Sequence, residues 1–95
     1  MPFKITWTSK SFEDISHIYN YLSYRISVET ANKIIDEIYH VPSKIKYVEQ
    51  FQTDEYRKDC RKIIIRNYKI LYTIINSEIF IIRVFNTFHN PTKSL

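Results

Sequence analysis

The segment from residue 60 to residue 88, CRKIIIRNYKILYTIINSEIFIIRVFNTF, restricts the fold most strongly. It lacks glycine and proline, and it is rich in the β-branched and aromatic residues that favour strands. We therefore predict three strands with tight links, at about residues 60–66, 68–76 and 78–87. Two-residue hairpin turns need positive φ, which glycine adopts most readily. Because the whole chain has no glycine, we expect Asn67 and Asn76 to adopt it instead.

The first half of the chain predicts one short strand and two helices. Phe3, Ile5 and Trp7 alternate with polar residues, which is the pattern of a strand with one buried face. Apolar residues then recur every three or four positions over about residues 11–25 and 28–41, which is typical of helices that bury one side. Two helices with a short link between them most simply form an antiparallel hairpin.

Polar residues and one proline indicate where the helices begin and end. Ser11 with Asp14 three residues later resembles a capping arrangement for the first helix, and Ser27 is expected as the N-cap of the second. Pro42 removes a helical hydrogen bond, so we expect the second helix to end or kink near residue 41 and to resume for about two turns. Residues 49–58 are polar and unpatterned and predict a loop.

The order of these elements predicts an α+β fold. It would consist of an N-terminal strand, an antiparallel helical hairpin and a three-strand antiparallel meander, with the helices packed on one face of a small sheet. A chain of 95 residues is long enough for one domain with one core. We therefore expect residues 1–95 to form a single domain.

Five cations lie within the sheet-forming segment: Arg61, Lys62, Arg66, Lys69 and Arg83. Burying a cation without a partner is costly, so we expect these side chains to project from the uncovered side of the sheet or its rim. Strict alternation in the last strand would put Arg83 on the same face as Ile79, Ile81 and Phe85. Between such apolar neighbours, Arg83 calls for either a buried carboxylate partner or an exposed role.

The charge distribution favours a negatively charged partner. Residues 1–54 carry six Lys or Arg and seven Asp or Glu, whereas residues 55–95 carry eight and three, a balance of +5 in the second part. Such an asymmetry favours nucleic acid or an acidic protein segment and does not distinguish between them.

Several classes of protein are excluded. The apolar runs are too short to span a bilayer, and the N-terminus has no apolar core of signal-peptide length. A single cysteine, Cys60, cannot form an internal disulfide, so a cytoplasmic location is expected. His17, His40, His89 and Cys60 show no metal-ligand spacing, and a glycine-rich phosphate loop needs glycine. We expect no metal, cofactor or membrane partner.

The order and spacing of five segments resemble the RelE/ParE superfamily of toxins from bacterial type II toxin–antitoxin modules. The segments are ITW, FEDISHIYNYL, ANKIIDEIY, RKIIIRNYKILYTI and IFIIRVFNTFHNP. Together they cover nearly the whole chain, so the resemblance implies one toxin domain over residues 1–95. RelE-like members cleave mRNA on the ribosome with Lys, Arg and a Tyr or His near the C-terminus. ParE-like members lack that set and are associated with poisoning of DNA gyrase.

The residues match the RelE-like set only in part. Lys62 and Lys69 fall where RelE-like enzymes carry catalytic cations, and His89 could stand in place of the terminal tyrosine. The other strand lysine would fall near Ile64, and the closing-strand arginine near Thr87 or Phe88. An apolar ring cannot stabilise a developing negative charge, so the resemblance favours the ParE-like arm.

The resemblance therefore implies a toxin that binds a cognate antitoxin and inhibits DNA gyrase by binding. Acidic antitoxin residues would pair with the cations of the sheet segment: Arg61, Lys62, Arg66, Lys69 and Arg83. The alternative is a ribosome-dependent mRNA endonuclease in which Arg61, Lys62, Lys69 and His89 carry the chemistry. A third reading is a decayed toxin that retains only antitoxin binding.

Overall fold

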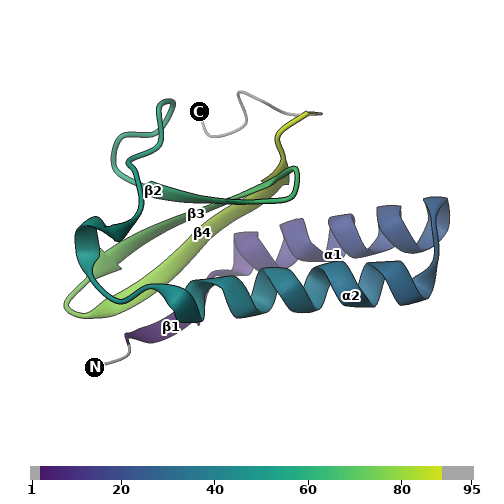
Figure 1. The fold of residues 1–95 in the computed structure, drawn as a ribbon, viewed down its shortest axis with the longest axis horizontal. Helices are drawn as coiled ribbons and strands as arrows, with labels where there is room; N and C mark the ends of the chain where they lie inside the picture. The colour runs from purple at the N-terminus through teal and green to yellow at the C-terminus, as the bar shows by residue number, and fades with distance from the viewer. Residues whose placement is uncertain (1–2, 89–95) are drawn as a thin grey trace.

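The computed structural model describes residues 3–88, which form one sheet and two helices (Figure 1). The elements in chain order are β1 (Lys4–Trp7), α1 (Ser9–Arg25), α2 (Val28–His40), β2 (Arg61–Ile65), β3 (Tyr68–Ile75) and β4 (Glu78–Asn86). Two short 3₁₀ helices, η1 (Val41–Lys44) and η2 (Val48–Gln50), lie between α2 and β2.

The sheet has the strand order β1-β4-β3-β2. β2, β3 and β4 form the expected antiparallel meander, and β1 pairs in parallel with the first part of β4, from Lys4 opposite Glu78 to Trp7 opposite Ile81. The two helices lie side by side on one side of the sheet and extend beyond its end (Figure 1). The predicted α+β fold is confirmed.

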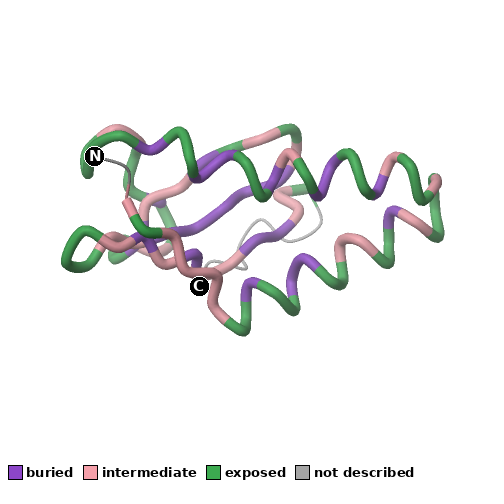
Figure 2. The backbone as a smooth tube through the Cα atoms, turned by 90° about the horizontal axis from the view of Figure 1, so that it is seen from below, coloured by how far each residue is buried: buried purple, intermediate pink, exposed green. Residues whose placement is uncertain are grey.

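The main core lies between the helices and the sheet. It contains Ile15 and Leu22 of α1, Ile38 of α2, and Ile70 and Ile81 of the central strands. Figure 2 shows the buried residues recurring along both helices and running through the central strands. A smaller cluster of Cys60, Leu71 and Phe85, with Ile82 packed against it, is separate from this core. Burial on both faces explains why the central strands are almost continuously apolar.

The helix ends differ from the prediction at two places. Thr8 caps α1: its hydroxyl accepts the Ser11 N–H at 3.2 Å and donates to the Ile81 carbonyl at 2.6 Å. The expected cap at Ser11 is wrong because the helix starts directly after β1. Ser27 is confirmed as the N-cap of α2, accepting the Thr30 N–H at 3.0 Å. After α2 the chain makes one 3₁₀ turn through Pro42, not two helical turns.

The two hairpin turns place residues other than glycine at positive φ, and they differ in which residues these are. Asn76 (φ 51°) and Ser77 (φ 64°) both have positive φ between β3 and β4, the pattern of a type I′ turn. Between β2 and β3 the positive φ falls on Arg66 (φ 55°) and not on Asn67. The prediction for Asn76 is confirmed, and that for Asn67 is wrong because this turn needs positive φ only at its first central residue.

A β-bulge in β4 breaks the strict alternation predicted from the sequence. Tyr72 lies opposite Ile81 and Leu71 lies opposite Arg83, so Ile82 is an extra residue in β4. An extra residue reverses the order of inward and outward side chains beyond it. Val84, and not Arg83, therefore joins Ile81 in the main core.

Candidate functional site

Lys62 and Lys69, the two candidate catalytic lysines, both bind the carboxylate of Glu55 in the loop before β2. Lys62 Nζ donates to Glu55 Oε2 at 2.8 Å, and Lys69 Nζ donates to Glu55 Oε1 at 3.0 Å. Lys69 also donates to Asp54 Oδ1 at 2.6 Å. The result is a continuous network of two ammonium groups and two carboxylates, which we call the lysine–carboxylate network.

The loop before β2 fixes the acids of this network. Asp54 N–H donates to the Cys60 carbonyl at 2.9 Å, which closes the loop. Asp54 Oδ2 accepts the N–H groups of Tyr56 and Arg57 at 3.0 and 2.8 Å, the arrangement of an Asx-turn. A carboxylate that accepts hydrogen bonds from two backbone N–H groups and an ammonium group is held in one orientation. Asp54 is therefore a rigid counter-ion for Lys69.

Lys69 is a buried cation with its charge satisfied. Only 4% of the residue is exposed, and its Nζ lies 5.1 Å from the centre of the Tyr56 ring and 5.7 Å from that of Phe85. Burial by itself would lower the pKa of Lys69, but hydrogen bonds to Asp54 and Glu55 outweigh it and leave the pKa raised. Hydrogen bonds from Lys62 and then Lys69 lower the pKa of Glu55 well below its usual range. Both shifts favour the charged forms of Glu55 and Lys69.

A cavity of about 260 Å³ opens beside the network. Its lining residues are Glu55, Tyr56, Lys62, Ile64, Lys69 and Thr87. Ile64 lies near the position where the RelE-like set has its other strand lysine. It is an apolar side chain, 53% exposed, and brings no charge to the cavity. Two cations bound to two acids leave no net positive charge for a phosphorane. The cavity can accept a small polar group, but its lysines are already engaged.

Two of the other three sheet-segment cations also have acidic partners. Arg83 donates to both carboxylate oxygens of Asp14, at 2.8 and 3.0 Å, so it has the buried carboxylate partner that was one of its two predicted roles. Arg66 donates to both oxygens of Glu37, at 2.7 and 2.9 Å. These side chains reach back to α1 and α2, and not toward an open face.

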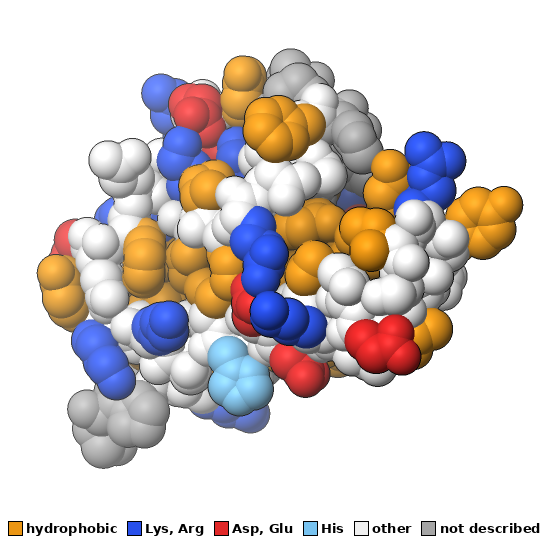
Figure 3. All heavy atoms as spheres, turned by 45° about the vertical axis from the view of Figure 1, so that its right-hand side comes forward, with side chains coloured by type: hydrophobic (Ala, Val, Ile, Leu, Met, Phe, Trp, Pro, Cys, Tyr) orange, Lys and Arg blue, Asp and Glu red, His pale blue; other side chains and the backbone are white. Residues whose placement is uncertain are grey.

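Arg61 has no carboxylate partner within residues 3–88, and its Nη1 donates to the Phe51 carbonyl at 2.6 Å. The five cations therefore do not form one open cationic surface, and their role in binding an antitoxin or target stays a prediction. On the face of the molecule shown in Figure 3, the Lys and Arg side chains are scattered, and carboxylates lie beside several of them. Pairing within the chain removes the cost of placing cations in a sheet buried on both sides.

The sequence reasoning missed the acids that complete these pairs. Asp14, Glu37, Asp54 and Glu55 come from two helices and a loop, and no local pattern links them to the strand cations. The candidate residue His89 lies outside the described residues. Phe88 follows the last strand and is 80% exposed, so it supplies no charge at the place where the nuclease pattern has an arginine.

No helix in the described part of the chain has the length and apolar character needed to cross a membrane. Within residues 3–88, no group of three His, Cys, Asp or Glu side chains is arranged to hold a metal ion.

A helical hairpin on one side of a four-stranded sheet, with strand order β1-β4-β3-β2, defines a small toxin of the RelE/ParE superfamily. The model of the ParE toxin of type II toxin–antitoxin systems (parDE) matches residues 5–90. Because this match spans most of the chain, the protein belongs to the ParE toxin family of type II toxin–antitoxin systems. A search of curated protein sequences gave no significant match.

Solved structures share this fold. The chain is similar to a protein of the chromosomal ParDE system from P. aeruginosa, with a TM-score of 0.77 and 20% identity over 88% of this chain and 95% of the other. It is similar to a chain of a RelBE toxin–antitoxin complex from Mycobacterium tuberculosis, with a TM-score of 0.67 and 13% identity over 90% and 92%. A RelE toxin variant from E. coli gives a TM-score of 0.54 and 19% identity over 99% and 93%.

Proposed function

We propose that this toxin acts by binding, without chemistry, and that its target is DNA gyrase. One observation carries the proposal: Lys62 and Lys69, at the positions where a nuclease would carry catalytic cations, are bound to Asp54 and Glu55. The match to the ParE family over residues 5–90 supports the same arm of the superfamily.

The chemical argument concerns the charge that RNA cleavage needs. Attack by a 2′-hydroxyl requires a base, an acid and cations that stabilise the phosphorane. Within residues 3–88 the lysines in question face carboxylates, and a carboxylate beside a phosphorane raises its energy. Phe88 adds an exposed ring where a cation would be needed. A site built in this way is suited to contact and not to phosphodiester cleavage.

We further propose that residues 1–95 act as one toxin domain in the cytoplasm, held inactive by a cognate antitoxin. Pairing of β1 with β4 and the contact between Asp14 and Arg83 join the two ends of the described chain into one body. The antitoxin would lie along the helical hairpin and the sheet, where apolar side chains can enter grooves beside the helices.

The second candidate function is a ribosome-dependent mRNA endonuclease. The observation in its favour is that Lys62 and Lys69 do converge on one cavity of about 260 Å³. In that case Glu55 would have to leave the lysines before RNA could approach, and Arg61 and His89 would complete the reactive set.

Induction of the toxin in a bacterium without antitoxin separates these functions. Gyrase inhibition predicts filamentous cells and DNA-damage signalling, with transcripts intact. A nuclease predicts rapid arrest of translation with cleaved transcripts. Normal growth of cells that contain folded toxin would count against both and support a decayed toxin.

A further inference from the structure

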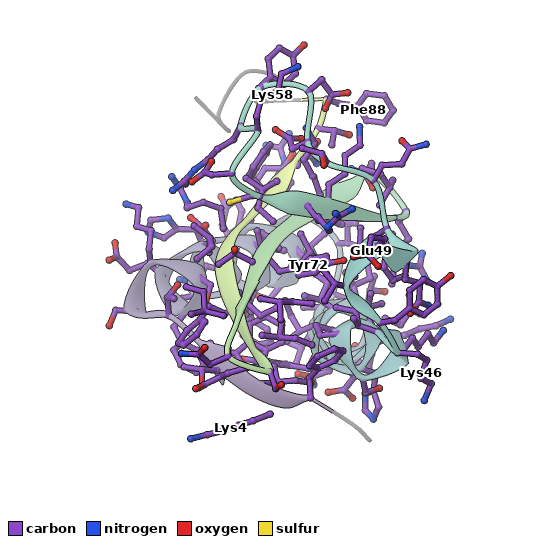
Figure 4. All side chains as sticks on the ribbon, turned by 90° about the vertical axis from the view of Figure 1, so that its left-hand side faces the viewer. Lys4, Lys46, Glu49, Lys58, Tyr72 and Phe88 are labelled. Carbon is purple, nitrogen blue, oxygen red and sulfur yellow. The ribbon has the colours of Figure 1, made fainter. Side chains whose placement is uncertain are left out.

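Within residues 3–88, two neighbouring exposed lysines in the link between α2 and β2 have no acidic partner. Lys44 and Lys46 are exposed, and neither side chain makes an ion pair or hydrogen bond within residues 3–88. Lys58 is also without such a partner in the described chain; its side chain points away from that of Lys46 (Figure 4), although Lys58 and Val48 line the same cavity of about 200 Å³. Two neighbouring cations that pair with no acid of residues 3–88 are available to an external carboxylate.

The backbone around these lysines is held in one shape. Ile45, between them, is 2% exposed and anchors the segment in the core. The Gln50 side chain accepts the Lys46 N–H at 2.5 Å and donates to the Lys44 carbonyl at 3.0 Å. A surface that is already ordered loses little conformational entropy on binding.

Apolar area lies beside the two cations. Tyr47 is 58% exposed and Val48 is 42% exposed. Val48 is also one wall of a cavity of about 200 Å³, which Cys60, Arg61 and Ile74 help to line. Aromatic side chains next to cations are typical of protein interfaces, and the cavity offers space for a partner side chain next to an arginine without a carboxylate partner in the described chain.

We propose that an acidic segment of the cognate antitoxin binds the surface formed by Lys44, Lys46, Tyr47 and Val48, which we call the 44–48 surface. Its carboxylates pair with the two lysines, and an apolar side chain packs on Tyr47 and Val48. This inference rests on the proposed function only in requiring an antitoxin. It assigns binding of the acidic segment to Lys44 and Lys46, because most cations of the sheet already pair with carboxylates of the chain.

A protein segment fits this surface better than nucleic acid does. Nucleic acid needs a run of cations that follows the phosphates, whereas here Glu49 lies directly beyond Val48 in the sequence and makes no ion pair with either lysine. The exposed Val48 suits an apolar anchor, and Asp59, which lines the adjacent cavity together with Lys58 and Arg61, disfavours a phosphate there.

The test uses the full-length toxin and the antitoxin encoded by the adjacent reading frame, purified together and then separated. The double variant Lys44→Gln/Lys46→Gln removes two charges without touching the core. The matched control, Lys4→Gln/Lys10→Gln, removes the same charge from exposed lysines whose acidic partners are 3.9 Å away. Tyr47→Ala probes the apolar part, and circular dichroism confirms that every variant is folded.

We expect the 44–48 variant to bind the antitoxin about tenfold more weakly, with a reduced salt dependence of the dissociation constant. We expect Tyr47→Ala to weaken binding by a similar factor and the control to stay within about twofold. Equal affinities and salt slopes for wild type and the 44–48 variant would overturn this inference alone. Loss of binding to a duplex DNA probe, with antitoxin affinity unchanged, would also overturn it. Failure of wild-type toxin to bind the antitoxin would overturn the proposed function as well.

Discussion

Asp14 in α1 and Arg83 in β4, 69 residues apart in the sequence, form a bidentate ion pair. Arg83 Nε donates to Asp14 Oδ2 at 2.8 Å, and Nη2 donates to Oδ1 at 3.0 Å. The same carboxylate accepts the Val84 N–H at 3.0 Å. β1 pairs with β4 only up to Ile81, so the β4 edge beyond that point needs another partner. Asp14 therefore both neutralises Arg83 and covers the open edge of the sheet.

We expect Asp14→Ala to lower the free energy of unfolding by about 3 kcal/mol, because it leaves Arg83 charged without a partner and Val84 N–H unbonded. Urea unfolding followed by circular dichroism measures this loss. Glu13→Ala is the matched control: the neighbouring residue forms an exposed pair with Lys10 at 3.9 Å and acts on Arg83 through a weaker Coulombic attraction without a hydrogen bond, and its removal should change stability by less than about 0.5 kcal/mol. Similar losses for both variants would show that the pair contributes nothing beyond the helix itself.

The Lys69–Asp54 pair should behave as one unit. We expect Lys69→Met to destabilise the protein by about 3 kcal/mol, since it leaves Asp54 buried without its ammonium partner. We expect Asp54→Asn to destabilise it by less, because Lys69 keeps Glu55 at 3.0 Å. The double variant should lose clearly less than the sum, with a coupling energy of about 1–3 kcal/mol. A double-mutant cycle from urea unfolding gives this value, and strict additivity would mean that the two side chains do not interact in solution.

Glu55 should contribute to acid stability. Hydrogen bonds from Lys62 and then Lys69 lower its pKa from the ordinary 4.5. A lowered pKa in the folded state gives stability that is present above pH 4.5 and is lost as the pH falls through the folded-state pKa. We therefore expect the free energy of unfolding to fall less steeply below pH 4.5 in Glu55→Gln than in wild type. Identical slopes in parallel denaturant titrations at several pH values would be incompatible with the observed pairing.

Lys62 offers a direct comparison between binding and chemistry. If the toxin acts by binding, Lys62→Gln should keep growth inhibition within about threefold of wild type, because a paired, partly exposed cation contributes little to an interface. A catalytic lysine would cost about 100-fold or more. The measurement is the inducer concentration that halts growth, at matched toxin levels. A loss of two orders of magnitude would favour the nuclease.

The turn after β3 should tolerate glycine better than serine. Ser77 has φ 64°, where glycine has no steric penalty. We expect Ser77→Gly to raise the free energy of unfolding by about 0.5–1 kcal/mol, because relief of the left-handed backbone penalty exceeds the cost of a more flexible unfolded chain. In the control Ser23→Gly, the same substitution in helix α1 should lower it by a similar amount. Destabilisation by Ser77→Gly would indicate that the hydroxyl, and not the backbone, matters at this turn.

The sequence predicted the parts of the fold that rest on local repetition. Apolar spacing in α1 and α2 and the run of strand-forming residues from Cys60 onward each follow from burial of one element at a time. The caps and turns were predicted in part, since Ser27 and Asn76 act through local backbone geometry. Thr8 caps α1 because the helix starts directly after β1. Arg66 has positive φ because the turn between β2 and β3 needs it at the first central residue.

The candidate site could not be predicted in the same way. Its cations were visible in the sequence, but their acidic partners lie 7 to 69 residues away and belong to other elements. The bulge at Ile82 also changes which side chains of β4 face the core, and alternation gives no sign of it. Sequence patterns predict a single strand, whereas the ion pairs of this sheet join strand cations to acids of the two helices and of the loop before β2.

The most direct measurement uses purified toxin, purified DNA gyrase and ribosomes programmed with mRNA, side by side. The paired lysines predict that the toxin inhibits gyrase supercoiling while the mRNA stays intact, and that added antitoxin restores supercoiling. Cleavage of the mRNA at toxin concentrations that leave supercoiling unchanged would contradict a toxin that acts by binding.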